Sequence, residues 1–126
     1  MAKTFDKKIR ETTHFLKMNE NIVKNEYLND GKTIHLYFNG MIGLYVAYGI
    51  SAFLLCKFAH AKPSYSEDMQ MPVAVINAEH YEELKKKLGL SKNISSYRCL
   101  VVDESADMDE YSEWADRLRM GGAESR

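Results

Sequence analysis

The spacing of apolar residues predicts a helix at the start of the chain. In residues 5–27 one side is formed at helical spacing by Phe5, Ile9, Thr12 and Leu16, while charged residues lie elsewhere. The stretch "YLNDGK" at 27–32 combines Asn, Asp and Gly, which favour turns. We therefore expect the helix to end there.

The most apolar part of the chain runs from Thr33 to Cys56 and contains no Asp, Glu, Lys or Arg. Such a run is long enough to cross a bilayer as a helix, but Asn39-Gly40 divides it with a dipeptide that favours a tight two-residue hairpin turn. The flanking segments "TIHLYF" and "MIGLYVAY" are rich in β-branched and aromatic residues, as strands are. After Gly49, "ISAFLLCKFAHA" returns to helical spacing. These patterns predict a hairpin followed by a buried helix rather than a membrane span.

The next predicted elements are a loop, a strand and a helix. The polar segment "AKPSYSEDMQ" is expected to be a loop, after which Pro72 opens the continuous apolar run "VAVI", typical of a strand inside a sheet. Asn77 is placed to cap the helix "AEHYEELKKKL", which Gly89 ends. The inner face of this helix is predicted to consist of Ala78, Tyr81, Leu84 and Leu88.

The last predicted strand is "YRCLVV" at 97–102, and a final helix follows it. Asp107, with Glu110 three residues later, forms a cap-like start for this helix. Its packing face is predicted to consist of Met108, Tyr111, Ala115 and Leu118.

Together these elements predict an α+β (mixed α/β) fold in the order α-β-β-α-β-α-β-α. The expected architecture is a single small mixed sheet of about four strands with helices packed on it. Residues 1–120 are expected to form a single globular domain, and "GGAESR" at 121–126 a flexible tail.

The composition is that of an ordinary globular protein. Apolar residues make up 45% of the chain and charged residues 28%, while a net charge of −1 gives no overall sign of a nucleic-acid or anionic membrane ligand. Cys56 and Cys99 lie in apolar runs, which favours buried reduced thiols over a disulfide or a reactive nucleophile. No segment resembling a signal peptide opens the chain, so a cytoplasmic protein without membrane contact is expected.

Motifs for catalysis or cofactor binding are not evident. The histidines are scattered, no glycine-rich loop joins a strand to a helix, and no Ser stands in a G-x-S-x-G context. Ser51 lies near a helix start, where a capping role is expected. "VVDES" places Asp103 and Glu104 at a strand end, so an enzyme or small-ligand site there is the least favoured hypothesis. We expect a protein that is not an enzyme and needs no metal or cofactor.

The strongest charge asymmetry is an acidic segment, 103–116, that contains no Lys or Arg. We hypothesise that it docks on the basic surface of a protein partner and that the chain is a small binding protein that regulates or inhibits a macromolecule, with a nucleic-acid-handling protein as the candidate. The predicted partner-binding residues are Asp103, Glu104, Asp107, Asp109, Glu110, Glu113, Asp116 and Trp114, with Tyr111 beside them. Two solvated faces of opposite sign would also explain the asymmetry.

The alternative is a nucleic-acid-binding module, which requires several cations on one face. The candidate residues are Lys85, Lys86, Lys87, Lys92 and Arg98. Aromatic residues concentrate around the hairpin and form either part of the core or an exposed face for bases or a protein partner: Tyr37, Phe38, Tyr45, Tyr48 and Phe53. An exposed aromatic face would fit a homodimer, so both monomer and homodimer are open.

The segment "LYVAYGISA" at 44–52 resembles a stretch near the start of the mismatch-repair protein MutS, which runs Phe-Tyr-Glu, a small or apolar residue, an aromatic residue, and on to Asp-Ala. Tyr45, Tyr48 and Ala52 match this pattern. Downstream, "MPVAVINAEHYEELKKKLGL" and "YRCLVVDES" are similar in order to a strand, a helix and a final strand of that domain. The resemblance covers roughly residues 27–104 and implies a small α/β domain of that kind.

The same resemblance implies that the mismatch-reading chemistry is missing. In MutS the Phe ring stacks on a mismatched base and the Glu carboxylate hydrogen-bonds it. Leu44 and Val46 stand at those two positions, and Ser51 stands where the family has Asp. Leucine has no π face and valine accepts no hydrogen bond, so the resemblance implies a nucleic-acid-binding module without mismatch reading.

Overall fold

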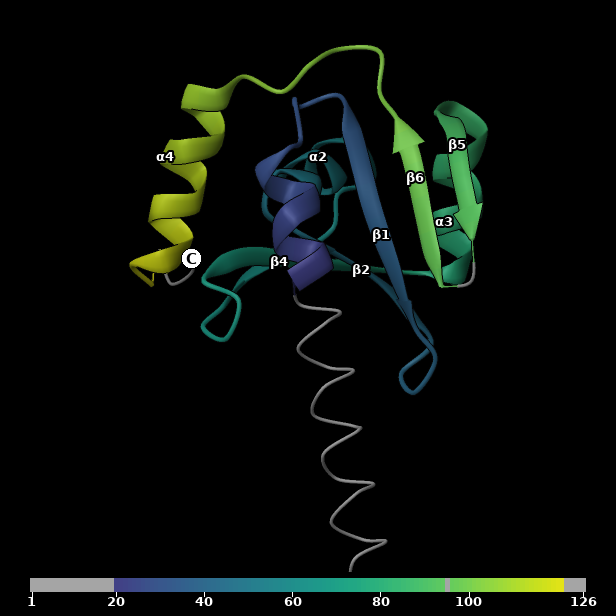
Figure 1. The fold of residues 1–126 in the computed structure, drawn as a ribbon, viewed down its shortest axis with the longest axis horizontal. Helices are drawn as coiled ribbons and strands as arrows, with labels where there is room; N and C mark the ends of the chain where they lie inside the picture. Colours follow the sequence, from purple (N-terminus) through teal and green to yellow (C-terminus); the bar gives the residue numbers. More distant parts are fainter. Residues whose placement is uncertain (1–19, 95, 122–126) are drawn as a thin grey trace, which may run out of the picture.

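The computed structural model describes residues 20–94 and 96–121, which form an α+β fold around one antiparallel sheet (Figure 1). Residues 20–27 are helical, and the predicted residues 5–19 of that helix lie outside the described part, as do 122–126 of the predicted tail. The elements that follow are β1 (Thr33–Asn39), β2 (Leu44–Tyr48), α2 (Gly49–Ala59), β3 (Pro63–Ser66), β4 (Met71–Asn77), α3 (Ala78–Lys87), β5 (Gly89–Ile94), β6 (Tyr97–Val101) and α4 (Met108–Arg119).

The sheet has six strands in the order β3-β4-β2-β1-β6-β5, and every neighbouring pair is antiparallel. The prediction of about four strands in a mixed sheet was therefore wrong, as was the predicted element order. The two missed strands, β3 and β5, form the two edges of the sheet. All six residues of β5 are exposed and β3 is the short polar segment "PSYS", so neither has the buried apolar face by which strands are found in a sequence.

The predicted hairpin is present, but its turn is wider than predicted. Asn39 is still paired with Leu44, and residues 40–43 form the loop. The Asn39 side chain accepts a hydrogen bond from the Met41 N–H at 3.0 Å, and the Gly43 N–H bonds the Asn39 carbonyl at 2.8 Å. Gly43, with a φ of 68°, takes the left-handed conformation that Asn39-Gly40 was expected to supply. The turn is wider than predicted because the Asn39 side chain hydrogen-bonds the backbone of the turn itself.

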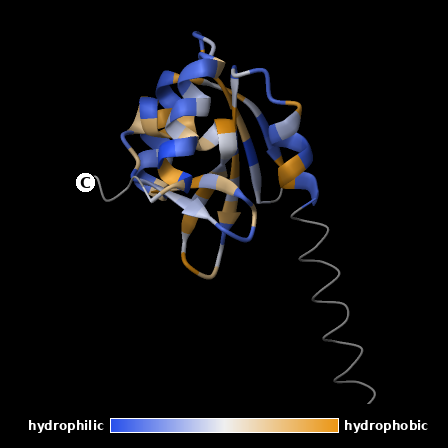
Figure 2. Ribbon diagram, turned by 90° about the vertical axis from the view of Figure 1, so that its left-hand side faces the viewer, coloured by the Kyte–Doolittle hydropathy of each residue, from blue (hydrophilic) through white to orange (hydrophobic). Residues whose placement is uncertain are grey.

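The core lies on one side of the sheet, beneath α2 and α3. Ile34, Leu36, Ala47 and Leu100 project from the strands on this side and are fully buried with Leu54 and Leu55 of α2. Tyr81 and Leu84 of α3 are buried as predicted, but Ala78 is exposed. Ala78 is the first residue of α3 and precedes the turn on which Tyr81 meets the sheet. In Figure 2 hydrophobic colours gather on the strands, whereas the helices carry both colours.

The helical residues 20–27 lie against the other side of the sheet (Figure 1). On this side β1 presents His35 and Tyr37, because successive strand residues point to opposite faces. Asn25 donates a hydrogen bond from Nδ2 to the Tyr37 hydroxyl at 2.8 Å and ties the helical segment to the sheet. No helix in the described residues is long and apolar enough to cross a membrane.

Candidate functional site

The acidic segment 103–116 is divided between a loop and α4. Asp103 and Glu104 lie in the loop after β6, and Glu104 is 3.8 Å from the Lys57 ammonium. Asp107 is the N-cap of α4, as predicted: its Oδ1 accepts hydrogen bonds from the Asp109 N–H at 2.9 Å and the Glu110 N–H at 3.1 Å. The Asp107 carboxylate therefore has a structural task in addition to its charge.

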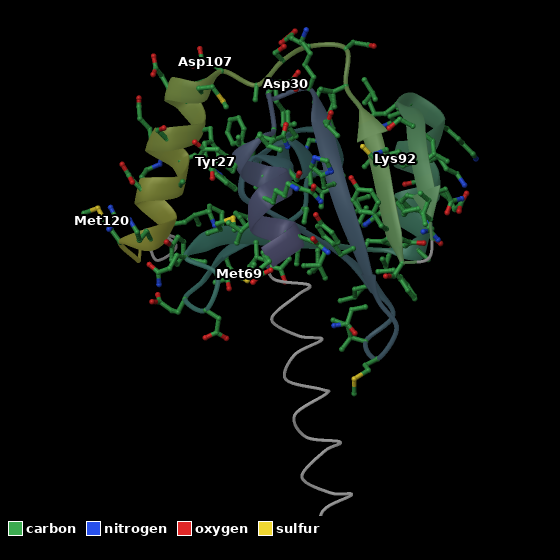
Figure 3. The ribbon with its side chains drawn as sticks, in the orientation of Figure 1. Tyr27, Asp30, Met69, Lys92, Asp107 and Met120 are labelled. Carbon is green, nitrogen blue, oxygen red and sulfur yellow. The ribbon has the colours of Figure 1, made fainter. Side chains whose placement is uncertain are left out.

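The carboxylates on α4 itself project away from the body of the protein. We define the acidic face as Asp109, Glu110, Glu113 and Asp116, all of which are exposed. Figure 3 shows oxygen-bearing side chains on the outer side of α4 between Asp107 and the end near Met120. Within the described residues, the one ion pair made by this face joins Asp116 to Arg119 at 3.4 Å. The charges of the other three carboxylates are thus left to solvent or to a partner.

Trp114 does not belong to the acidic face. Its ring meets Phe53 of α2 edge-on, with ring centroids 5.2 Å apart, and Tyr111 contacts the same Phe53 at 5.8 Å. Tyr111, Ala115 and Leu118 are half-buried as predicted, but Met108 is 43% exposed. Met108 lies one turn before the residues that reach Phe53, so it falls at the rim of the contact. The aromatic residues anchor α4 and the acids face outward.

The five predicted nucleic-acid-binding cations do not share one surface. Lys85, Lys86 and Lys87 lie on α3, where the Lys85 ammonium pairs with Glu82 at 3.0 Å and lies 5.3 Å from the centre of the Tyr81 ring. Arg98 lies on the same side of the sheet, with its guanidinium 6.0 Å from the centre of the Tyr45 ring. Lys92 is paired in register with Cys99, the residue after Arg98, so it belongs to the opposite side of the sheet.

The aromatic residues around the hairpin are also divided by the sheet. Phe38 and Tyr45 are on the core side, where the Tyr45 ring stacks on Tyr81 with centroids 4.3 Å apart. Tyr37 and Tyr48 are on the opposite side, and Tyr37 lies 5.5 Å from Tyr97 between ring centroids. The sequence predicted an aromatic concentration but not this division, which follows from strand alternation once the register is known.

A pocket that the sequence did not predict lies on the Tyr37 side of the sheet. Its volume is about 420 Å³, which is in the range of small-ligand sites. The lining residues come from the helical segment 20–27, β1, β5 and the start of β6: Asn21, Lys24, Asn25, Tyr37, Lys92, Ser96 and Tyr97. The sequence could have indicated one wall of this pocket, because residues 21, 24 and 25 share one face of a helix. It gives no sign of which strands form the opposite wall.

A buried carboxyl group, Glu26, is the second feature that the sequence did not predict. Glu26 is 6% exposed, and Ser51 donates to it twice: from the hydroxyl to Oε2 at 2.5 Å and from the backbone N–H to Oε1 at 3.0 Å. Asn29 Nδ2 lies 3.3 Å from the same Oε1. Burial raises the pKa of Glu26 to about 7, although these hydrogen bonds act in the opposite direction. Ser51 therefore serves Glu26 rather than capping α2, whose N-cap is Tyr48.

The buried serine and the cysteines are poor candidates for nucleophiles. Ser51 is fully buried, so no substrate reaches its hydroxyl. Cys56 and Cys99 are both free, and burial raises the pKa of the Cys56 thiol to about 11. Among the described residues, no three His, Cys, Asp or Glu side chains gather where they could hold a metal ion.

No family of known proteins, no curated protein and no solved structure matches this chain. The resemblance of residues 27–104 to MutS therefore stays a prediction.

Proposed function

We propose that this chain is a non-enzymatic binding protein that regulates or inhibits a macromolecular partner through the acidic face of α4. The observation that carries the proposal is that the two sides of α4 differ in their side chains and their contacts. Its inner side is fixed on Phe53 by Tyr111 and Trp114, while its outer side exposes carboxylates of which one, Asp116, makes an ion pair within the described residues. An acidic face held in place in this way is complementary in charge to a basic surface on the partner.

The proposed partner is a protein that handles nucleic acid. Such proteins hold phosphates with Lys and Arg, and carboxylates on successive turns of a helix can occupy the same cationic groups. Opposite charge speeds the encounter, and the effect weakens as salt rises. Asp103 and Glu104, in the loop before α4, extend the same sign of charge beyond the helix.

The test compares two triple variants of equal charge change. Asp109→Lys, Glu113→Lys and Asp116→Lys reverse the acidic face, whereas Glu67→Lys, Asp68→Lys and Glu79→Lys reverse three exposed acids elsewhere. Asp109 and Glu79 each lie in the first turn of a helix, so both sets remove one favourable interaction with a helix dipole. Proteins from a nuclease-treated extract are captured on the wild-type chain and identified, and each purified candidate is then titrated with both variants.

The proposal requires a captured partner whose binding is lost in the α4 variant, retained in the control and displaced by added DNA. Equal binding of both variants would overturn it, and so would a partner that DNA does not displace. Circular dichroism of the variants shows whether α4 is intact, so that loss of folding is not mistaken for loss of charge.

The alternative function is the nucleic-acid-binding module that the MutS resemblance implies. The observation that favours it is Lys92, which lies beside Tyr37 and Tyr97 in the pocket rather than with the cations of α3. Fluorescence anisotropy with labelled duplex, mismatched duplex and single-stranded DNA, at low and then physiological salt, tests this directly. Salt-sensitive binding would favour the module, and absence of binding at low salt would exclude it.

A further inference from the structure

We propose that the pocket between the helical segment 20–27 and the β1–β6 pair binds a nucleoside phosphate. This site is separate from the acidic face, and the inference does not rest on the proposed partner. It rests on three properties of the lining residues: two positive charges, two tyrosine rings and two amide side chains, in a cavity of about 420 Å³.

The positive charges come from two elements far apart in the sequence. Lys24 projects from the helical segment and Lys92 from β5, and both line the pocket. Figure 3 shows Lys92 on the edge strand beside β6. Neither ammonium pairs with a carboxylate within the described residues, and the seven lining residues include no Asp or Glu. An anion such as a phosphate group would therefore meet uncompensated positive charge.

The imidazole of His35 lies on the same side of the sheet as the pocket. It lies next to the pocket, with Nδ1 2.5 Å from the Tyr97 hydroxyl. Its pKa is lowered, first by burial and then by the positive charge of Lys92. Both effects disfavour the protonated form of the His35 imidazole.

The tyrosine rings form an aromatic wall. Tyr37 and Tyr97 are directly paired across β1 and β6, and their ring centroids are 5.5 Å apart. Their hydroxyls are held by neighbours, Tyr37 by the Asn25 amide at 2.8 Å and Tyr97 by His35. The rings are therefore fixed in orientation before a ligand arrives. Fixed aromatic rings beside lysines are the combination that binds a base and its phosphate together.

The amide side chains supply the remaining recognition. Asn21 and Asn25 lie one helical turn apart and both face the pocket. Each carries a carbonyl acceptor and two N–H donors, which match the mixed donor and acceptor edges of a base. Within the described residues, Asn25 uses one N–H on Tyr37 and keeps its second N–H and its carbonyl oxygen for a ligand. The modest volume favours a single nucleotide, either free or as one unit of a single strand, over a duplex.

The test is a titration of the full chain with AMP, GMP, CMP and UMP, and separately with adenosine and with inorganic phosphate. Calorimetry measures affinity, and amide chemical shifts of Tyr37, Lys92 and Tyr97 locate the site. We expect saturable binding of at least one mononucleotide, with adenosine and phosphate each weaker by about tenfold or more because each lacks half of the contacts. Absence of mononucleotide binding, or equally tight binding of phosphate alone, would overturn the proposal.

Titration with a short single-stranded oligonucleotide distinguishes a free nucleotide from one nucleotide unit of a strand as the ligand of this pocket. Tighter binding of the oligonucleotide than of its mononucleotide assigns the pocket to one unit of a strand, and equal or weaker binding assigns it to a free nucleotide. In either case the amide shifts must fall on the same residues. Shifts confined to α3 or to α4 would contradict the proposed site.

Matched variants distinguish the contribution of the Tyr97 ring to binding from that of the Lys24 and Lys92 charges. Lys24→Gln and Lys92→Gln should each weaken binding by about tenfold, while Lys62→Gln, an exposed lysine that does not line the pocket, should leave it unchanged. Tyr97→Phe keeps the ring but loses the contact to His35, so it should weaken binding less than Tyr97→Leu, which should lose about tenfold because the stacking surface is gone. The triple lysine variant of the acidic face should bind the nucleotide at least as tightly as the wild type. A Tyr97→Leu variant that binds normally would contradict the role of the ring.

Discussion

Ser51 donates two hydrogen bonds to the carboxyl group of Glu26, from its hydroxyl and from its backbone N–H, and joins the helical segment 20–27 to α2 through the interior. Asn29 extends this contact by donating from Nδ2 to the Thr33 carbonyl at 2.9 Å. The Ser51 hydroxyl oxygen in turn accepts from the His35 N–H at 2.9 Å. One buried polar cluster therefore connects the helical segment, β1 and the first turn of α2, and it determines how the wall of the pocket is held on the sheet.

The first prediction concerns Glu26 and pH. The pKa of Glu26 is raised from 4.5 to about 7 by burial, so the unfolded chain loses this proton at lower pH than the folded chain does. The stability associated with the neutral carboxyl is therefore complete below about pH 4.5 and is lost as pH rises to about 7, by on the order of 3 kcal/mol. Glu26→Gln has no such loss. Urea unfolding of both proteins from about pH 4.5 to about pH 8 should show the variant gaining relative stability.

The companion variant for this prediction is Ser51→Ala. It removes the hydroxyl donor that lowers the pKa of Glu26, so the relative loss of stability should extend to higher pH than in the wild type. A stability difference between wild type and Glu26→Gln that does not change with pH would contradict the prediction, because it would show that folding does not shift the pKa of Glu26.

The second prediction concerns Gly49, the first residue of α2. Its φ is 57°, and a Cβ placed there would lie 3.3 Å from both Cγ and Oε1 of Glu26 and from Sδ of Met71. Gly49→Ala should therefore lower the free energy of unfolding by about 2 kcal/mol, from left-handed strain and crowding of the buried carboxyl. Gly40→Ala is the control, since its Cβ would meet Phe38 at an ordinary 3.7 Å. Equal effects of both substitutions in urea unfolding would contradict the prediction.

The third prediction concerns Tyr81, whose ring stacks on Tyr45 while its buried hydroxyl has no hydrogen-bond partner within the described residues. Tyr81→Phe keeps the stacking and removes the unpaired group, so it should raise the free energy of unfolding by about 1 kcal/mol. Tyr37→Phe is the matched comparison, because that hydroxyl accepts from Asn25. Tyr37→Phe should leave the free energy of unfolding unchanged or lower it. If Tyr37→Phe raises the free energy of unfolding and Tyr81→Phe does not, the explanation is contradicted.

The fourth prediction separates the structural and electrostatic roles of Asp107. Asp107→Ala removes the side chain that accepts from the Asp109 and Glu110 N–H groups and should cost about 1 kcal/mol. Asp107→Asn keeps the cap without the charge and should restore most of this stability. Trp114 is the one tryptophan of the chain and packs on Phe53, so its fluorescence reports loosening of α4. Unaltered Trp114 emission and stability in Asp107→Ala would show that the cap is unimportant.

Local signals in the sequence were sufficient for the elements whose ends or buried faces lie close together in the chain. Asn77 and Asp107 begin α3 and α4 as predicted, because a cap acts on N–H groups two or three residues away. The position of the hairpin and of α2 was also predicted, since each follows from an apolar pattern that spans a single element. The exact turn was not predicted, because Asn39 bonds its own backbone instead of adopting the left-handed conformation.

Only the tertiary structure shows which strands form the edges of the sheet and which residues come together in each candidate site. β3 and β5 bury too little side chain to have a pattern, and only pairing with β4 and β6 makes them strands. Trp114 was assigned to the acidic face from sequence proximity, but helical geometry turns it inward onto Phe53. Lys24 and Lys92 come to one pocket because Tyr37 pairs with Tyr97 across β1 and β6. Sequence patterns record which side of an element is buried, whereas a site depends on which elements become neighbours, and that is determined by the packing of the whole chain.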